Sequence, residues 1–282
     1  MAVNINGDTG IDKVQPGSVD GVDLTDGSVT EGKIGTGAVT ADKIGTGAVT
    51  SAKLDANISV PGTVTATSFS GDGSSLTGIA GGFSNMEVFT SSGTWTNPGS
   101  VQKVKVTVVG GGGSGGGGAG GYNLQGGGGG GAGGAAIEVI SFPSATNVPV
   151  TVGGGGSSVG ASNSYQGPNG ATGGTSSFGA YCSATGGEGG RGVDQPSAYG
   201  DGGSGSGGTI NISGGDGDLY WGDFNGRGGN SLTGSGGGSD RMSNGFLSIP
   251  GRGYGAGGSG GAYCNGSKPS GAGSSGVVIV EY

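Results

Sequence analysis

Glycine is concentrated in one part of this chain. Of the 167 residues from 110 to 276, 62 are glycine, against 18 of the first 109. Glycine has no side chain to bury, and it loses more backbone freedom on folding than any other residue. A glycine-rich segment therefore becomes ordered only if backbone hydrogen bonds offset that entropy. This constraint excludes a large apolar core of the ordinary globular kind in the second half of the chain.

Two common explanations of glycine-rich sequence do not fit. Collagen has glycine at every third position, whereas the runs Gly110–Gly113 and Gly126–Gly131 fill all three. Disordered tracts lack the apolar and aromatic islands that interrupt this region. A third arrangement is polyglycine II, an extended threefold helix whose backbone groups point outward and bond to neighbouring helices packed side by side. The sequence predicts packed rods of this kind, roughly 25 Å long for eight residues.

The glycine-rich region is bracketed by predicted β-strands. Residues 101–109 alternate, with Val104, Val106 and Val108 on one face. Further strands are predicted at 87–89, 93–96, 135–142, 148–152 and 277–282. Since the last of these is remote in sequence, we expect the C-terminus to return beside the earlier strands. The result would be a β-sandwich-like base from which the glycine rods and their loops extend.

A ten-residue unit recurs four times between Gly17 and Ala56. Valine occupies positions 19, 29, 39 and 49, and leucine or isoleucine occupies positions 24, 34, 44 and 54. One apolar residue every five positions fits neither an α-helix nor a plain strand, and one chain alone cannot bury these side chains. We interpret the repeat as an elongated homotrimeric stalk. A flexible linker is the alternative.

The expected fold is all-β and fibrous, in four parts. Residues 1–16 form an N-terminal attachment segment, 17–60 the stalk, 61–85 a short collar and 86–282 the glycine-rich distal tip domain. In the collar, Val64, Ala66 and Ser68 suggest a short strand, and Leu76 and Ile79 a small apolar plug.

Composition also excludes several functions. The chain has no histidine, which removes the commonest general base and metal ligand, and we expect no enzyme activity, no cofactor and no metal. A net charge of −8 has the wrong sign for nucleic acid. The N-terminus shows no secretory signal, and the apolar runs are too short to span a membrane, so we expect a soluble chain made in a reducing cytoplasm. Cys182 and Cys264 are either small buried residues or a disulfide.

Binding residues are expected in the islands between glycine tracts, which would form the turns between rods. Two islands combine aromatic or apolar side chains with a cation, as interface hot spots do. The candidate receptor-binding residues are Tyr220, Trp221, Asp223, Phe224 and Arg227 in one island, and Arg241, Met242, Phe246 and Leu247 in the other. The alternative is that these side chains pack over the rod ends or between protomers.

The stalk units GAVTADKIGT and GAVTSAKLDA, the collar VTATSFSGDGSSLTGI, and the opening GTWTNPGSVQKVKVTVVGGGG with the ending GVVIVEY resemble bacteriophage tail-fibre proteins with a C-terminal glycine-rich domain. The resemblance covers nearly the whole chain. It implies a homotrimer in the virion, assembled in the host cytoplasm, whose N-terminus docks onto the tail or another fibre protein. It also implies a distal domain that binds a bacterial surface glycan or outer-membrane protein.

Three functions are therefore considered. The first is a receptor-binding tail fibre that mediates adsorption through its tip loops. The second is a passive spacer or decoration fibre of the virion, in which the loops only pack. The third is an ice-binding polyglycine protein, which would need a flat, regular face of threonine or alanine.

Overall fold

The computed structural model describes residues 27, 29–30, 32, 34–45, 48–49, 62–65, 83, 85–98, 101, 103–120, 126–142, 146–193, 199–220, 224–238, 248–263 and 267–282. The chain divides into two compact units, Met1–Leu76 and Thr77–Tyr282. The predicted attachment segment at 1–16 and collar residues 66–82 lie outside the described residues.

In the first unit, the apolar residues of the decapeptide repeat are exposed. Val29, Ile34, Val39, Ile44 and Val49 each leave between 46% and 55% of their surface accessible. The local structure repeats as well, because the N–H of Ala38 donates to the Gly35 carbonyl and the N–H of Ala48 donates to the Gly45 carbonyl. The single chain therefore leaves the side chains that define the repeat uncovered.

Turns and one short helix make up the described part of this unit. Gly37 has φ of 74°, as the third residue of a type II turn requires, and Gly27, one repeat earlier, has φ of 78°. A 3-10 helix, η2, spans Ala41–Lys43. Among the described residues, no helix is long and apolar enough to cross a membrane.

The second unit consists of short β-strands joined by glycine-rich segments. The strands are β1 (Met86–Phe89), β2 (Gly93–Thr96), β3 (Lys103–Val109), β4 (Ala135–Ser141), β5 (Asn147–Thr151), β6 (Ser176–Phe178), β7 (Cys182–Ala184), β8 (Gly205–Ser206), β9 (Ile210–Ile212), β10 (Thr233–Ser235), β11 (Arg252–Tyr254), β12 (Ala262–Tyr263), β13 (Ser267–Lys268) and β14 (Val277–Glu281). All six strands expected from the sequence are present, with ends that differ by up to two residues.

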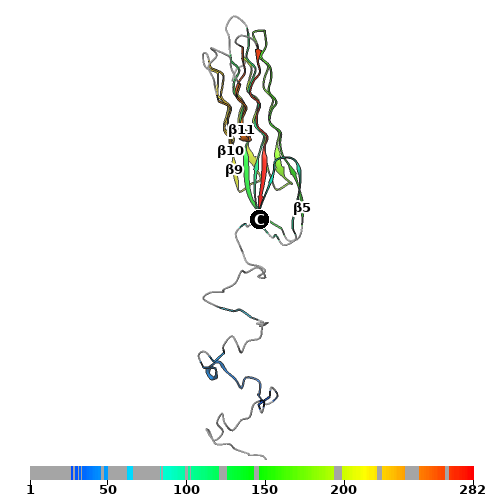
Figure 1. Ribbon diagram of the computed structural model, residues 1–282, viewed down its shortest axis with the longest axis vertical. Helices are drawn as coiled ribbons and strands as arrows, with labels where there is room; N and C mark the ends of the chain where they lie inside the picture. Colours follow the sequence, from blue (N-terminus) through cyan, green and yellow to red (C-terminus); the bar gives the residue numbers. More distant parts are fainter. Residues whose placement is uncertain are drawn as a thin grey trace, which may run out of the picture. The chain divides into compact units, whose positions relative to one another are not determined.

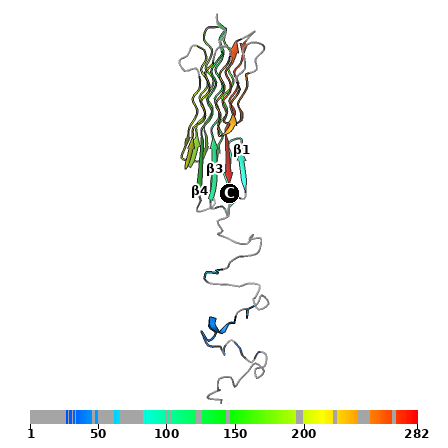
Figure 2. The ribbon, with the colours of Figure 1, turned by 90° about the vertical axis from the view of Figure 1, so that its left-hand side faces the viewer.

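One five-stranded antiparallel sheet has the order β1-β14-β3-β4-β9 (Figure 2). The C-terminal strand β14 lies between β1 and β3, pairing Val280 with Glu87 on one side and with Val106 on the other. The predicted return of the C-terminus beside the earlier strands is confirmed. This return closes the glycine-rich segments into a loop that starts and ends in the same sheet.

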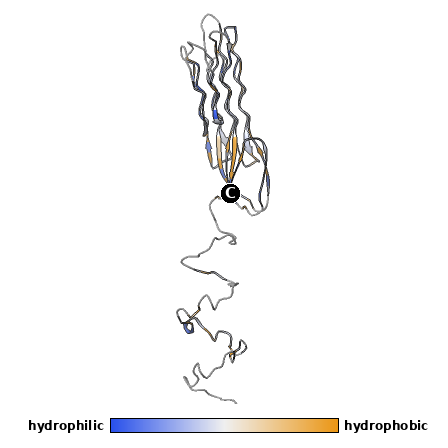
Figure 3. Ribbon diagram, viewed as in Figure 1, coloured by the Kyte–Doolittle hydropathy of each residue, from blue (hydrophilic) through white to orange (hydrophobic). Residues whose placement is uncertain are grey.

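A second five-stranded antiparallel sheet, β2-β5-β6-β7-β8, packs against the first. Val104, Val106 and Val108 point from β3 into the shared core, as their alternation predicts. From the second sheet, Trp95 of β2 fills the facing side of this core and contacts the ring of Phe178, with the two ring centroids 5.9 Å apart. Apolar side chains gather in these strands, at the end of the unit where the C-terminus lies (Figure 3). The sandwich-like base is therefore the apolar core of this unit.

Twelve extended segments continue from the strands and run alongside one another (Figure 1). We call these segments rods 1 to 12 and together the rod array. They are residues 110–118, 126–134, 153–160, 167–175, 185–193, 199–204, 213–219, 225–230, 235–238, 248–251, 255–261 and 269–276.

Hydrogen bonds between rods follow a threefold rotation. The N–H groups of Gly110, Gly111 and Gly112 donate to rods 2, 4 and 12 in turn, and the next three N–H groups of rod 1 return to these rods in the same order. The carbonyls of Gly111, Gly112 and Gly113 accept from rods 5, 3 and 11. Rod 1 therefore bonds to six neighbours, which is the pattern expected of packed threefold polyglycine II helices.

Rods 2 and 11 have the same arrangement. Rod 2 donates to rods 5, 7 and 11 and accepts from rods 1, 6 and 8. Rod 11 bonds to rods 1, 2, 8, 9, 10 and 12. These three inner rods contact one another, and the other nine described rods surround them. The inner rods thus satisfy their backbone groups through neighbours rather than through an apolar core.

The inner rods are nearly side-chain-free because their neighbours leave no room. A Cβ atom added to Gly113, Gly130 or Gly258 would come closer than 3.0 Å to a carbonyl oxygen of an adjacent rod. The exceptions are small and buried. Ser114 of rod 1 accepts a hydrogen bond from the N–H of Ala171 at 2.8 Å through its hydroxyl, and Ser259 of rod 11 accepts one from the N–H of Ile249.

Two outer rods expose a side chain at every third residue. Rod 5 exposes Thr185, Glu188 and Arg191, and rod 7 exposes Ser213, Asp216 and Leu219. A threefold helix returns to the same face at every third residue, so one face of each of these rods is turned toward solvent, where a side chain has room.

Cys182 is free and buried in the sandwich core. This finding excludes the alternative of a disulfide with Cys264, a residue that lies outside the described part of the chain. Burial raises the pKa of the Cys182 thiol to about 11, with a smaller contribution from the negative charge of Glu138. The interpretation of Cys182 as a small buried residue is confirmed.

Candidate functional site

The rod ends that lead into the islands lie at the end of the array opposite the sheets. Gly117 of rod 1 donates to Pro168 of rod 4, and Gly116 accepts from Gly261 of rod 11. Gly128 of rod 2 donates to Arg191 of rod 5. Each of these residues lies within a few positions of a connection between two rods. The described rod ends that flank these connections therefore lie in one region, which we call the tip.

The first candidate island includes the end of rod 7 and the start of rod 8. The N–H of Asp218 donates to the Arg227 carbonyl at 2.8 Å, so these residues lie opposite each other at the base of the connection. Phe224 is 44% exposed, Arg227 is exposed and Tyr220 is half-buried. Thus Tyr220, Phe224 and Arg227 lie together at or beside the tip, as the sequence predicts.

The other candidate site residues lie outside the described residues. They are Trp221 and Asp223 from the same connection, and Arg241, Met242, Phe246 and Leu247 from the second island. The second island does leave and re-enter the array at described positions, since Gly237 bonds to rod 11 and Ile249 accepts from Ser259. Its connection therefore starts and ends on rods 9 and 10, next to an inner rod.

Asn225 fixes the end of the first connection. Its side chain is buried, and its amide nitrogen donates to the Gly260 carbonyl at 2.5 Å. The next residue, Gly226, donates its N–H to Gly127 of rod 2. Phe224 therefore directly precedes Asn225, which is bonded to rod 11, and Gly226, which is bonded to rod 2. These hydrogen bonds position the backbone next to the tip.

A connection that the sequence analysis did not select also reaches the tip. Residues 161–166 join rods 3 and 4, and Ser162 forms a parallel bridge with Ala119. The hydroxyls of Ser162 and Ser164 are 2.8 Å apart, and that of Ser164 donates to the Gln166 carbonyl. Tyr165, which lies between Ser164 and Gln166 in the sequence, is 59% exposed. The sequence does mark this connection, through an aromatic residue in a serine-rich island. The candidate islands were chosen because they also contain a cation, and this island has none.

The sequence predicts that the two candidate islands, which span residues 209–227 and 240–254, form turns between rods, and this prediction is wrong for part of each island. Residues 210–212 form β9 in the first sheet, where Ile210 pairs with Ile137 of β4. Residues 252–254 form β11, which pairs with β10 near the sheets. The physical reason is that a chain running up and down the array must turn at both ends, and island composition does not distinguish the ends.

Charges on the described outer rods are mostly acidic. Glu188, Asp201 and Asp216 are exposed on the adjacent rods 5, 6 and 7. Arg191 pairs with Glu188 at 3.5 Å, a surface ion pair that contributes little to stability. Among the described residues, no three histidine, cysteine or acidic side chains are grouped so as to hold a metal ion.

The pKa of Glu138 is lowered by hydrogen bonds to its carboxylate. The hydroxyl of Thr209 donates to the Glu138 carboxylate at 2.7 Å, and the Thr209 N–H donates to the same oxygen. These bonds favour the charged form and lower the pKa of Glu138. Because Thr209 precedes β9, the bonds tie the β8–β9 connection to β4. The Glu138 carboxylate lies at the sheet end of the unit, and its role there is to hold these two elements together.

These features define a class of all-β protein in which two antiparallel sheets carry an array of hydrogen-bonded glycine rods. Residues 88–282 match a known family described as a glycine-rich domain. This match covers more than half of the chain, which therefore belongs to that family of glycine-rich domains. No curated protein matches the sequence.

Proposed function

We propose that the chain is a phage tail-fibre protein whose tip loops bind the surface of a bacterial host. The observation that carries the proposal is the exposure of large side chains at the tip of an otherwise small-residue scaffold. Tyr165, Leu219 and Phe224 are each between 44% and 59% exposed there. Exposed aromatic side chains beside a cation are typical of binding hot spots.

The rod array suits such a role because its inner rods are held by hydrogen bonds to neighbouring rods. The inner rods are bonded on all sides by described residues of the same chain. Loop sequences could then change to suit a new receptor without altering the packing beneath them. Binding residues on loops held by a rigid scaffold are a common solution to this problem.

The remaining parts of the proposal concern assembly. We infer that the repeat trimerises, because Val29, Ile34, Val39, Ile44 and Val49 are exposed in the single chain. Three copies could bury these side chains against one another. The proposed N-terminal partner is the virion tail or another fibre protein, and the proposed location is the virion. The proposal involves no enzyme activity, no cofactor and no nucleic acid.

The receptor is proposed to be a glycan or protein on the bacterial surface. The tip offers uncharged aromatic and hydroxyl groups around Tyr165, and an aromatic residue with a cation around Arg227. Both glycans and proteins are bound by such combinations.

The test compares tip variants with matched variants at the sheet end. In the full chain, Trp221→Ala and Arg227→Ala should each weaken binding to a sensitive bacterial strain by about tenfold or more, since hot-spot truncation costs roughly 2 kcal/mol. Leu232→Ala and Arg252→Ala remove an exposed apolar residue and an exposed cation near the sheets. These two controls should bind like the unmodified chain.

Each variant would first be shown to have the oligomeric state and the thermal midpoint of the unmodified chain. If the tip variants then bind as well as the controls, the assignment of these residues is wrong. If deletion of the tip connections has no effect on infection, a passive spacer fibre is the better account.

A further inference from the structure

The face of the first sheet that points away from the second sheet is apolar, and we call it the outer face. Antiparallel sheets that meet solvent on one side usually place polar residues there. In this sheet, one row of directly opposed β-branched residues crosses all five strands. The row consists of Val88, Ile279, Thr107, Ile137 and Ile210. These residues alternate along their strands with residues that fill the shared core, such as Val106 and Val280.

Several large side chains of the outer face are exposed in the single chain. Val88 and Ile210, at the two ends of the row, are 45% and 52% exposed. Met86 and Val139, at the two ends of the next row, are 66% and 51% exposed. Figure 2 shows the sheet from this side, with β1, β14, β3 and β4 side by side. Apolar side chains that are exposed together on one face mark an interaction surface.

The row of the outer face nearest the rods is already covered by the same chain. It consists of Val277, Val109, Ala135 and Ile212, of which the first three are buried. Gly255, directly after β11, packs on this row, since a Cβ atom added to it would lie 2.7 Å from Cγ1 of Val109. The uncovered part of the outer face is therefore formed by the two rows farther from the rods.

Charged side chains of the outer face lie at the end farthest from the rods. Lys105 and Glu281 bond to each other there, with Nζ and Oε2 2.7 Å apart, and Lys103 lies further out on β3. The row from Val88 to Ile210 carries no charge. An apolar centre with charged groups at its margin is the usual composition of a protein interface. Each chain has a net charge of −8, so copies repel each other least at a surface with little net charge.

Three copies of this chain fit together geometrically through the outer face. Five strands spaced about 4.8 Å apart make the sheet roughly 19 Å wide. Three sheets of this width, arranged as the sides of a triangle, would each lie roughly 5.5 Å from the axis, which is close to half of the ~10 Å between packed sheets. Side chains from the three copies would therefore meet at the axis.

The size of the outer face indicates which copies are its partners. The two uncovered rows give an area of roughly 300 Å² per copy, against about 800 Å² per partner in a standard stable interface. Copies held together by the repeat would reach a high local concentration, at which a small interface is sufficient. The partners are therefore the other two copies of the same trimer, rather than free copies or another protein.

We propose that the three outer faces of a trimer pack around its threefold axis, so that β1 of each copy lies beside β9 of the next. The inference rests on the trimer proposed above, and it gives the glycine-rich unit a part in holding that trimer together. The strands β1 and β9 are the two edges of the sheet, so neighbouring copies meet at strand edges as well as at the axis. Of the described strands, β1 is also the first after the repeat, so the segment that follows the repeat leads directly to this contact.

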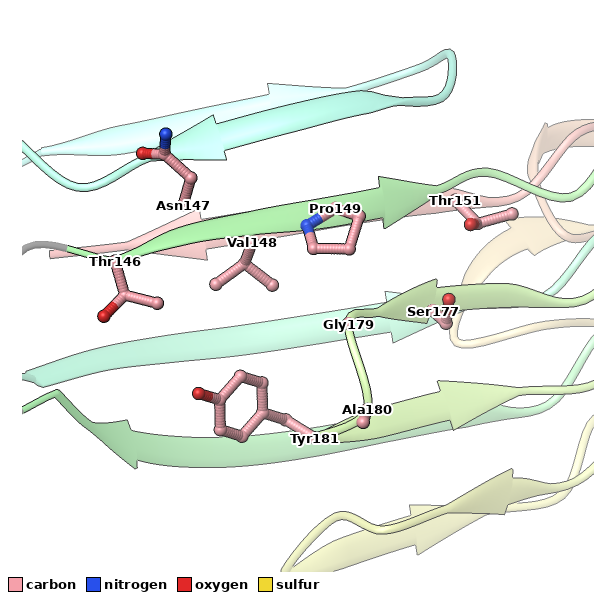
Figure 4. A pocket seen from close by; sticks show the side chains of 9 residues that line it. All are labelled: Thr146, Asn147, Val148, Pro149, Thr151, Ser177, Gly179, Ala180 and Tyr181. Carbon is pink, nitrogen blue, oxygen red and sulfur yellow. The ribbon is translucent and has the colours of Figure 1, made fainter.

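The first experiment measures distances between copies by pulsed electron paramagnetic resonance. The full chain with Cys264→Ser carries one spin label, at Ile210→Cys, while Cys182 is buried and takes up no label. The three labels should lie roughly 20 Å apart, since Ile210 is at the edge of a sheet roughly 19 Å wide. The matched control is Thr151→Cys, because Thr151 is exposed on β5 of the second sheet (Figure 4). Its labels should be at least about 10 Å farther apart, since packed sheets are ~10 Å from each other.

The second experiment tests which strands are neighbours. Val88→Cys and Ile210→Cys are combined in one full chain with Cys264→Ser, and a short bis-maleimide joins cysteines that lie close together. Within one chain, these two positions are at opposite edges of the sheet, roughly 19 Å apart and beyond the reach of a short linker. The double variant should therefore give a covalent trimer as the main product on a denaturing gel. Each single variant is a matched control that cannot give a covalent trimer, because one cysteine joins at most two chains.

Sedimentation of each variant beforehand separates the possible failures. If a trimeric chain keeps its Ile210 labels as far apart as its Thr151 labels, or gives no covalent trimer, the outer-face contact is wrong while the trimer stands. If the double variant does not assemble, the distance between the Ile210 labels decides. A monomeric unmodified chain would overturn both the trimer and the contact. Neither experiment measures binding to bacteria, so failure of the tip assignment leaves both results unchanged.

Discussion

At the scale of single residues, glycine in this protein has two distinct roles. On the inner rods it permits backbones to approach until a Cβ atom would overlap a neighbouring carbonyl group. On parts of the outer rods it has no such constraint, and a Cβ atom on Gly154 would meet nothing within 4 Å. The same residue type is thus indispensable at one position and replaceable at another.

Replacing Gly130 and Gly154 by alanine should separate these roles. Gly130→Ala places Cβ against the carbonyls of Gly113 and Ser114 and should lower the free energy of unfolding by about 3 kcal/mol or more, as severe overpacking does. Gly154→Ala should be neutral or stabilising by roughly 0.5 kcal/mol, because alanine restricts the unfolded chain. Chemical denaturation of both variants measures the difference. Equal stability of the two variants would contradict the packing of the inner rods.

The buried thiol of Cys182 gives a second prediction at this scale. Because burial raises its pKa to about 11, the thiol is protonated and unreactive at neutral pH. In a Cys264→Ser variant, alkylation of the native chain at pH 8 should proceed only as fast as the chain opens, and denaturant should restore rapid labelling. Fast labelling of the native protein at Cys182 would show that the sandwich core is accessible.

At the scale of elements, the strands could be predicted from the sequence and the rod contacts could not. The alternation Val104, Val106, Val108 is a local pattern, and it correctly indicated both the strand and its buried face. Which rods lie beside rod 1 depends on bonds between residues far apart in sequence, and glycine has no side chain to specify a partner. A partial signal exists, because exposed side chains recur at every third position in rods 5 and 7, which are outer rods.

The candidate site, too, could be predicted only in part from the sequence. Composition selected the island containing Tyr220, Phe224 and Arg227, and the array brings these residues to or beside the tip. Tyr165 was missed because its island has no cation. Ile210 was assigned to a loop between rods but lies in β9, since turns at the two ends of the array have similar composition.

The contact between β4 and the β8–β9 connection should depend on pH. Hydrogen bonds from Thr209 lower the pKa of Glu138 below its ordinary value of 4.5, so they stabilise the fold when the carboxylate is charged. This stabilisation is present above that ordinary value and is lost as pH falls through the lowered pKa. Glu138→Gln should therefore be less stable than the unmodified chain at pH 7 and closer to it in acid. Denaturation at pH 7 and pH 3 measures this, and a difference independent of pH would contradict it.

The repeat gives a further prediction for an element. If three copies bury the exposed isoleucines, Ile34→Ser with Ile44→Ser should make the trimer dissociate on dilution, since each buried isoleucine contributes roughly 1.5–3 kcal/mol. Thr36→Ser, at an exposed turn position of the same repeat, should leave the trimer intact. Sedimentation at several concentrations distinguishes these outcomes. A monomeric unmodified chain would refute the stalk.

At the scale of the whole molecule, the groups that hold the glycine-rich unit together differ from the side chains that this unit exposes. Three inner rods are bonded on every side within one chain, and two sheets supply the apolar core. Tyr165, Leu219 and Phe224 are exposed at the end of the array opposite the sheets, and the sheet end exposes large side chains as well, among them Met86 and Val139. The division between bonded rods and apolar sheets explains how a chain with 30% hydrophobic residues can order its glycine-rich segments.

The central claim is that this tip recognises a bacterial surface. The most direct measurement is flow cytometry of fluorescently labelled full chain on a panel of bacterial strains, beside a variant with residues 220–224 replaced by glycine. The account predicts saturable binding to some strains and not others, lost in the variant. Binding to no strain by a correctly assembled chain, or selective binding that the variant retains in full, would contradict it.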